Sequence, residues 1–138
     1  MSDKVFLDTN VLVYSYSSTE PEKQKIAQKC VTDNDGHAWV STQVLNEFNS
    51  VLYRKFTLPY RDILLAMDEL EAIFQVTLVS SQTIRQALLL GDRYQYSYFD
   101  SLILASALEQ GCTVLYSEDM QNRQKIAGQL EIINPFVA

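Results

Sequence analysis

Val5-Phe6-Leu7-Asp8-Thr9-Asn10 runs three apolar residues directly into an acid, a hydroxyl and an amide. A short apolar run without polar alternation is typical of a strand that is covered on both faces. Polar residues just past the carboxyl end of such a strand lie where open parallel sheets bind ligands. A surface turn that closes an edge strand is the alternative, because Asp and Asn are common turn residues. Acids in equivalent places elsewhere in the chain would favour a site.

The same pattern returns late in the chain, where the apolar segment 112–117 leads directly into Glu118 and Asp119. Further short strands are expected at 37–41, 75–80 and 130–136. Helices are expected at about 21–31, 42–56, 59–74, 81–90 and 101–109, and around Arg123 and Lys125. This order predicts an α/β domain with a mainly parallel sheet of about five strands. Right-handed crossovers would bring the carboxyl ends of the central strands together.

The composition is that of one compact domain spanning residues 1–138. Hydrophobic residues make up 47% of the 138-residue chain, Gly and Pro number only 4 and 3, and no linker divides it. The N-terminal region meets acids at Asp3 and Asp8 and so lacks a signal-peptide apolar segment. No apolar run approaches the roughly 18 residues that a membrane span requires. We therefore expect a cytoplasmic protein without a membrane partner.

The charges and the cysteines argue against two kinds of site. A formal net charge of -6 disfavours broad electrostatic binding to phosphate backbones, which needs clustered Lys and Arg. A role on nucleic acid therefore has to work through bound cations and local basic patches. Cys30 and Cys112 have no CxxC or nearby histidine pattern, so neither a disulfide framework nor a zinc site is indicated. We expect both cysteines to be reduced and buried.

Two of the acids that follow strands or begin helices also have a purely structural explanation. Glu47 lies early in the 42–56 helix, where a carboxylate is a favourable partner for the helix dipole. Asp100 follows Ser97 at the spacing of a capping box, in which it would satisfy backbone donors at the helix start. The same placement of Asp100 puts its carboxylate at the mouth of the sheet.

Aromatic and basic residues offer possible contacts to a nucleic acid. The aromatic residues before the 101–109 helix are Tyr94, Tyr96, Tyr98 and Phe99. These rings either pack around the domain or stack on bases of single-stranded RNA. Arg54 and Lys55 suit the helix end electrostatically and could also contact phosphate. His37 has no partner at ligand spacing and is expected at a strand end, and Trp39 is expected in the core.

The candidate site gathers four acids on the same edge of the expected sheet: Asp8, Glu47, Asp100 and Asp119. Carboxylates crowded into one pocket repel one another, so protons or cations must neutralise them. Oxygen ligands without Cys or His fit Mg²⁺ or Mn²⁺ better than zinc. Such an ion can lower the pKa of a bound water and neutralise charge on a phosphodiester, which is hydrolase chemistry. The residues expected to orient the carboxylates or water by hydrogen bonds are Thr9, Asn10 and Ser117.

With these residues in place, the chain resembles a PIN-domain ribonuclease of the VapC toxin type over essentially its whole length. The matching segments are Leu7-Asp8-Thr9-Asn10-Val11-Leu12, Ser41-Thr42-Gln43-Val44-Leu45-Asn46-Glu47-Phe48, Phe99-Asp100-Ser101-Leu102-Ile103, Ser117-Glu118-Asp119 and Asn134-Pro135-Phe136. Each segment is weak alone, whereas their order and intervals together are specific. The resemblance implies a PIN-like three-layer α/β/α fold.

The resemblance also implies an activity and partners. It implies a metal-dependent endoribonuclease that cleaves RNA, with the four acids around Mg²⁺ or Mn²⁺ and Asn10 supporting them. It further implies a homodimer and inhibition by a small antitoxin that docks along the apolar helices. In two respects the chain departs from the pattern: many relatives have a basic residue where Glu118 stands, and a further downstream acid seen in some relatives is replaced here by the Gln121-Asn122 region. Glu118 either adds a ligand or weakens the approach of RNA.

Three other functions compete with this interpretation. A catalytically weak or inactive PIN scaffold would bind RNA or protein without cleaving it. A response-regulator receiver domain also gathers acids at strand ends, but Lys4 and Lys125 do not fit the place of its lysine. A phosphatase with Asp8 as nucleophile is disfavoured because Asn10 stands where its second acid is expected.

Overall fold

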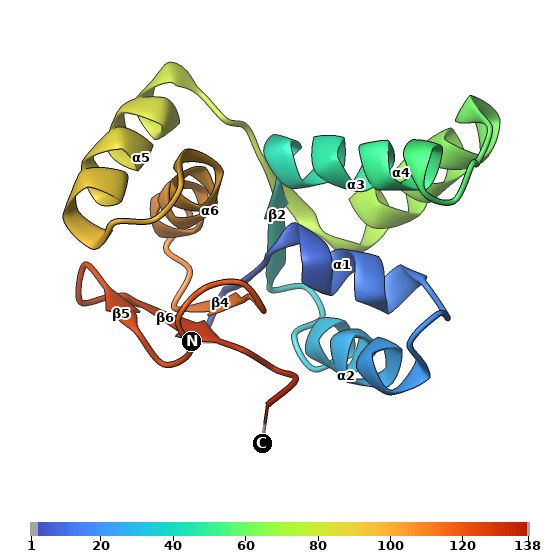
Figure 1. Ribbon diagram of the computed structural model, residues 1–138, viewed down its shortest axis with the longest axis horizontal. Helices are drawn as coiled ribbons and strands as arrows, with labels where there is room; N and C mark the ends of the chain where they lie inside the picture. The colour runs from blue at the N-terminus through green and yellow to red at the C-terminus, as the bar shows by residue number, and fades with distance from the viewer. Residues whose placement is uncertain (1–2, 138) are drawn as a thin grey trace.

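The computed structural model describes residues 3–137 and has an α/β architecture, with helices packed around a six-stranded sheet (Figure 1). The strands are β1 (Val5–Leu7), β2 (Ala38–Ser41), β3 (Gln75–Thr77), β4 (Val114–Tyr116), β5 (Lys125–Ile126) and β6 (Leu130–Ile133). The helices are α1 (Thr9–Tyr16), α2 (Pro21–Thr32), α3 (Thr42–Arg54), α4 (Tyr60–Ile73), α5 (Ser81–Tyr94) and α6 (Tyr98–Glu109). The strand order is β3-β2-β1-β4-β6-β5, and only the β5–β6 pair at one edge is antiparallel. The expected α/β class with a mainly parallel sheet is confirmed.

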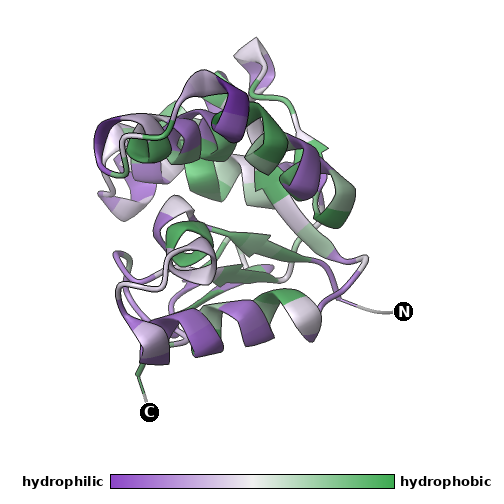
Figure 2. Ribbon diagram, turned by 90° about the vertical axis from the view of Figure 1, so that its right-hand side faces the viewer, coloured by the Kyte–Doolittle hydropathy of each residue, from purple (hydrophilic) through white to green (hydrophobic). Residues whose placement is uncertain are grey.

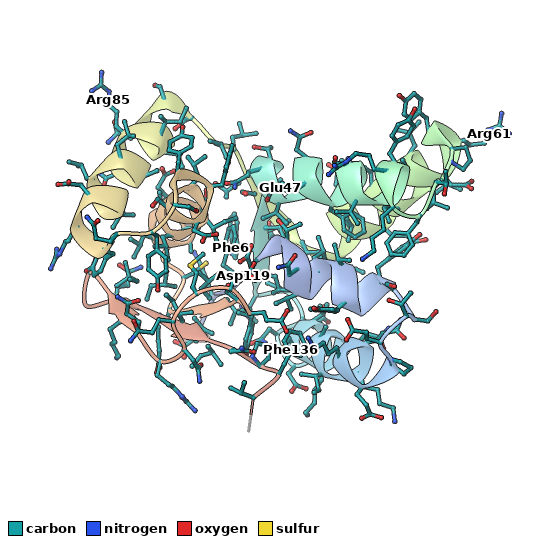
Figure 3. All side chains as sticks on the ribbon, viewed as in Figure 1. Phe6, Glu47, Arg61, Arg85, Asp119 and Phe136 are labelled. Atoms are coloured by element: carbon teal, nitrogen blue, oxygen red, sulfur yellow. The ribbon has the colours of Figure 1, made fainter. Side chains whose placement is uncertain are left out.

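Strand β1 lies in the middle of the sheet, between β2 and β4, and is parallel to both. Phe6 is opposite Trp39 on one side and Leu115 on the other, and its side chain is fully buried. Figure 3 places Phe6 at the centre of the molecule, whereas Arg61 and Arg85 project from its outer edges. The edge-strand alternative for residues 5–10 is therefore wrong.

Parallel pairing and helical crossovers bring three strand ends to one edge of the sheet. β1 ends at Leu7, β2 at Ser41 and β4 at Tyr116. In Figure 1, α1 and α2 lie on one side of the sheet and α5 and α6 on the other. Figure 2 shows apolar colour on several central strands and a mixture of apolar and hydrophilic colour on the helices, as expected for a sheet covered by helices.

Helices α3 and α6 have different burial patterns that follow from their sequences. In α3 the apolar stripe Val44, Leu45, Phe48 and Leu52 is buried, as its spacing predicts. In α6 every residue from Ser101 to Ala107 is buried, so this helix is covered on all sides. It begins at Tyr98, earlier than expected, because Ser97 caps it.

Four local expectations are wrong, and one helix was missed. α1 was not among the expected helices, because residues 11–16 are mostly apolar and aromatic and show no helical period. β3 stops at Thr77, before residues 78–80, and β6 stops at Ile133, before residues 134–136. Helix α5 does not end at Gly91 but continues to Tyr94. A Cβ at Gly91 would lie 2.9 Å from Ser101 Oγ, so this glycine allows α5 and α6 to approach closely.

The fourth wrong expectation is a helix around Arg123 and Lys125. The chain forms the short strand β5 there instead, so the sheet has six strands and not the expected five. Lys125 and Ile126 pair antiparallel with β6. Ala127 and Gly128 have φ values of 52° and 68°, which reverse the chain and cannot occur within a right-handed helix.

The remaining expectations for single residues hold within residues 3–137. Cys30 and Cys112 are buried and form no disulfide. His37 lies next to β2 and is exposed, and Trp39 packs against the core as a partly buried side chain. None of the helices in this part of the chain combines the length and the apolar character needed to cross a membrane.

Candidate active site

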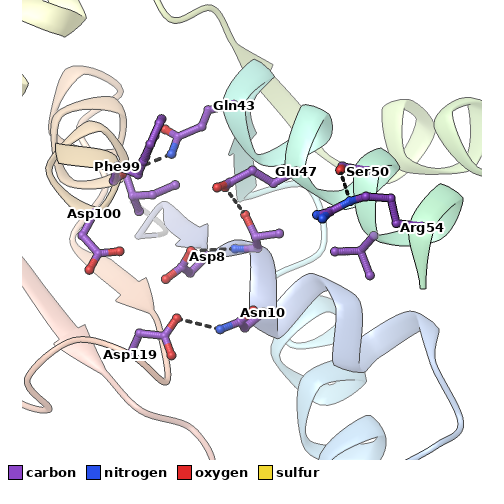
Figure 4. A pocket seen from close by; sticks show the side chains of 12 residues that line it. Asp8, Asn10, Gln43, Glu47, Ser50, Arg54, Phe99, Asp100 and Asp119 are labelled. Atoms are coloured by element: carbon purple, nitrogen blue, oxygen red, sulfur yellow. Dashed lines mark hydrogen bonds between the residues drawn. The ribbon is translucent and has the colours of Figure 1, made fainter. Parts of the chain in front are cut away.

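The four acids singled out in the sequence line one pocket of about 280 Å³ (Figure 4). Its lining residues are Asp8, Thr9, Asn10, Gln43, Glu47, Ser50, Val51, Arg54, Phe99, Asp100, Ile103 and Asp119. They come from the start of α1, one face of α3, the start of α6 and the loop after β4. The fold thus brings together four short segments that are far apart in the sequence.

Asp8 is the most deeply placed of the four acids, with only 6% of its surface exposed. It is the N-cap residue of α1, and its Oδ1 accepts a hydrogen bond from the backbone N–H of Thr9 at 2.7 Å. Its Oδ2 accepts from Ser117 Oγ at 2.8 Å. Burial raises the pKa of Asp8 from 3.8 to about 6, against the two hydrogen bonds, with smaller contributions from Asp100 and Asp119. A buried carboxylate with a raised pKa needs a proton or a cation.

Glu47 lies in the second turn of α3 and does not serve the helix dipole, because the first turn of α3 contains no acid. Its Oε1 accepts a hydrogen bond from Thr9 Oγ1 at 2.7 Å. This bond joins α3 to the first residue of α1. Glu47 is therefore held by a contact across the pocket rather than by its own helix.

Asp100 is the third residue of α6, and its backbone N–H donates to Ser97 Oγ at 3.2 Å. A full capping box also needs a return bond from the N-cap backbone N–H to the third side chain. Helix α5 forms both bonds, through Ser80 and Thr83. Within residues 3–137, Asp100 forms only the first. Its carboxylate is thus left to face the pocket.

Asp119 follows β4 in a loop, and its Oδ2 accepts a hydrogen bond from Asn10 Nδ2 at 2.6 Å. Its backbone N–H donates to Ser117 Oγ at 3.2 Å, so Ser117 contacts two of the acids. Partial burial raises the pKa of Asp119, and the charges of Asp100 and Glu118 add to that effect. Figure 3 shows Glu47 and Asp119 in the central part of the molecule although they come from different elements.

The donor set of the pocket fits a hard divalent cation, since its charged ligands are all carboxylates. Among residues 3–137, Asp8 has no ion pair with Lys or Arg that could neutralise it. In the same range, no three acidic, histidine or cysteine side chains lie close enough together to share one ion. Binding by three of the acids therefore requires some of these side chains to move toward one another.

Glu118 points away from the pocket and does not line it. Its Oε2 lies 2.6 Å from Lys23 Nζ, and its Oε1 accepts a hydrogen bond from Tyr14 at 2.8 Å. Burial acts to raise the pKa of Glu118, but the bonds from Lys23 and Tyr14 outweigh it and hold the pKa below its usual value. Phe136 completes this cluster, with its ring 5.1 Å from that of Tyr14. In this structure Glu118 binds the loop to α1 and α2.

The four aromatic residues around the start of α6 divide into two pairs. Tyr94 accepts a hydrogen bond from the backbone of Ala127, and Tyr96 accepts one from the backbone of Gln121. Tyr94 and Tyr96 therefore support the 119–129 segment. Tyr98 and Phe99 are exposed by 42% and 62%, and of these Phe99 lines the pocket.

The sequence interpretation missed Gln43 and Ser50, which line the pocket beside Glu47. Both lie on the same face of α3 as Glu47, at steps of four and three residues, and this spacing is the signal that could have identified them. Gln43 Nε2 donates to the backbone carbonyl of Phe99 at 3.1 Å. That bond links α3 to the start of α6, next to Asp100.

The chain matches a protein family model and several solved structures. The family model described as PIN domain matches residues 5–126. Among curated proteins, none gives a significant sequence match. Solved structures with the same fold include a toxin-antitoxin complex from Klebsiella pneumoniae, with a TM-score of 0.75 and 17% identity over 96% of this chain and 98% of that chain.

Two further solved structures are similar in fold. Mycobacterium tuberculosis VapC20, a sarcin-ricin loop cleaving toxin, has a TM-score of 0.68 and 22% identity over 84% of this chain and 90% of its own. A DNA-bound VapBC complex from Salmonella typhimurium has a TM-score of 0.70 and 18% identity over 95% of this chain and 97% of that chain.

Proposed function

The chain belongs to the PIN domain family, and from this membership we propose that it is a metal-dependent endoribonuclease whose active site is the four-acid pocket. The observation that carries the proposal is the convergence of Asp8, Glu47, Asp100 and Asp119 on that pocket. The structural explanations for single acids do not account for it, because Glu47 and Asp119 are bonded to the first residues of α1 rather than within their own elements.

The proposed ligands of Mg²⁺ or Mn²⁺ are these same four acids. When bound, the cation supplies a lowered water pKa and neutralises charge that develops on the phosphodiester. Ser117 holds Asp8, Thr9 holds Glu47 and Asn10 holds Asp119, each by a side-chain hydrogen bond. Partners of this kind fix the orientation of ligating carboxylates and raise their affinity for a metal.

We further propose that the protein is the toxin of a toxin-antitoxin pair. The fold similarity to chains of a toxin-antitoxin complex and to a sarcin-ricin loop cleaving toxin supports this assignment. The proposed partners are RNA as substrate, a small antitoxin protein and a second copy of the chain. Exposed apolar side chains on α4 and α5, Leu64, Leu65, Leu88 and Leu89, are of the kind that partner surfaces cover.

A catalytically weak or inactive PIN scaffold that binds RNA or protein is the second candidate. The observation that favours it is the separation of the acids, no three of which share one coordination point within residues 3–137. The receiver and phosphatase interpretations are not retained, because the chain belongs to the PIN domain family.

Cleavage of a mixed RNA pool by the purified protein separates the two candidates. The endoribonuclease needs Mn²⁺ or Mg²⁺, loses activity in EDTA, and loses it by about 100-fold or more when Asp100→Asn removes one charged ligand. Asp92→Asn is the matched control, because Asp92 is exposed and does not line the pocket. Mn²⁺ at 100 times its Kd is also expected to raise the free energy of unfolding of the wild type by about 2.7 kcal/mol, which is seen as a higher Tm. Absence of both cleavage and stabilisation would favour the scaffold.

A further inference from the structure

Arg54 is a cation in the pocket that the four acids line, yet within residues 3–137 it forms an ion pair with none of them. Its Nε donates to Ser50 Oγ at 2.9 Å, one turn earlier on α3. Nε carries only one of the five N–H groups of a guanidinium, so the other four remain for another partner. Figure 4 shows Arg54 and Ser50 on the opposite side of the pocket from Asp100.

A favourable position at the end of α3 does not by itself account for Arg54. Arg54 lies in the last turn of α3, where positive charge suits the helix dipole. Lys55 follows it and supplies the same charge, but Lys55 does not line the pocket. The planar guanidinium of Arg54 also matches two oxygens of one phosphate, which an ammonium does not.

The polar side of α3 lines the pocket along most of the helix, so the pocket is elongated. Gln43, Glu47, Ser50 and Arg54 all line it and follow one another at steps of four, three and four residues. This spacing is a single stripe along the helix, and the eleven residue steps from Gln43 to Arg54 rise about 16 Å. Stacked bases are about 3.4 Å apart along a strand, so the stripe is long enough for more than one nucleotide.

The rim at the Gln43 end of this stripe carries an exposed aromatic ring. Phe99 lines the pocket, directly precedes Asp100, and is 62% exposed. Its backbone carbonyl accepts the hydrogen bond from Gln43, and its ring contacts that of Tyr98 edge-to-face at 5.5 Å. An exposed ring that is held in place in this way can stack on an unpaired base.

We propose that the pocket binds single-stranded RNA along the α3 stripe, with one backbone phosphate on Arg54, the cleaved phosphodiester at the acids, and an unpaired base on Phe99. This inference rests on the proposed endoribonuclease function and deepens it. Paired bases in an RNA duplex are already stacked and cannot lie on Phe99, so the substrate is unpaired at this point. Arg54 also supplies one positive charge beside the acids in a chain of net charge -6.

Binding of a short, unstructured, labelled RNA tests the phosphate contact. Asp100→Asn is used as the background, so that the RNA stays intact, and the dissociation constant is measured against salt concentration. Arg54→Gln is expected to weaken binding about five- to tenfold for all sequences. It should reduce the slope of log affinity against log salt by about 0.7, the value for one phosphate contact on a single strand. Lys55→Gln, an equal change of charge on the adjacent residue, should leave the slope unchanged.

Abasic nucleotides placed at each position of the RNA in turn test the base contact. One abasic position should weaken binding to protein with Phe99, and the same position should have no effect in Phe99→Leu. Equal salt slopes for Arg54→Gln and Lys55→Gln, or undiminished sensitivity of Phe99→Leu to that position, would overturn the proposal. Cleavage of RNA by the wild type is measured separately. If the wild type cleaves RNA and either of these results is found, only the inference about Arg54 and Phe99 fails. If the wild type cleaves no RNA, the proposed function itself fails.

Discussion

Ser117 Oγ donates a 2.8 Å hydrogen bond to Asp8 Oδ2, joining residues that are 109 positions apart in the chain. The same oxygen accepts the backbone N–H of Asp119 at 3.2 Å. Ser117 is fully buried and directly follows β4, so its hydrogen bond holds the Asp8 carboxylate, which follows β1, at a fixed place beside the end of β4. Two central strands thereby fix two of the candidate ligands relative to each other.

Replacing Asp8 by Asn is expected to stabilise the metal-free protein at neutral pH. Burial raises the pKa of Asp8 from 3.8 to about 6 in the folded state, so folding favours the protonated form. The stability that this proton contributes is fully present below pH 3.8 and is lost as the pH rises through 6. The difference between the two pKa values corresponds to roughly 3 kcal/mol. Asn is neutral at every pH, so the free energy of unfolding of Asp8→Asn should exceed that of the wild type by up to this amount above pH 7.

Urea unfolding in EDTA across the range from acid to neutral pH measures this difference. Asp68→Asn is the control, because Asp68 is exposed on α4 and the substitution is chemically identical. The gap between Asp8→Asn and the wild type should widen with rising pH, whereas Asp68→Asn should follow the wild type. A gap that stays constant with pH would show that desolvation of Asp8 is not the cause.

Removing the hydroxyl of Thr9 is expected to lower activity while the fold persists. Thr9 Oγ1 is the donor that holds Glu47 Oε1 at 2.7 Å. Thr9→Val keeps the shape of the side chain but leaves the Glu47 carboxylate free to rotate, and loss of such a partner typically costs about 10- to 100-fold. Thr9→Ser retains the donor and should recover most of the activity. Steady-state RNA cleavage together with thermal unfolding measures both, and failure of Ser to rescue would contradict the assigned contact.

The convergence of the acids on one pocket could be predicted from sequence, because three of the four stand beside a strong local signal. Asp8 and Asp119 follow apolar strands, and Asp100 begins an apolar helix. In a parallel sheet these signals necessarily meet at one edge. Helix α1 gave no such signal, since its residues are apolar on nearly all sides, and the positive φ values at Ala127 and Gly128 have no periodic pattern that could reveal them.

The pairing of side chains within the site could not be predicted. Thr9, Asn10 and Ser117 are polar residues next to acids, which suggests support for the acids but not which acid each one holds. The bonds join residues 38 and 109 positions apart, and only the folded register selects them. Glu118 is the clearest case, because its direction depends on Lys23, which lies 95 positions away.

The pair of Lys23 and Glu118 is expected to position Asp119. Lys23 Nζ and Glu118 Oε2 are 2.6 Å apart, and this ion pair ties Glu118, the residue before Asp119, to α2. Glu118→Lys places two positive charges together and should shift the loop, lowering kcat about tenfold, below the ~100-fold that a 1 Å misplacement can cost. Adding Lys23→Glu restores the opposite charges and should recover most of kcat.

If Glu118 merely repelled RNA, Glu118→Lys would instead lower KM. Glu131→Lys reverses the acidic charge of the Arg123–Glu131 pair, which is remote from Asp119 in sequence, and controls for net charge.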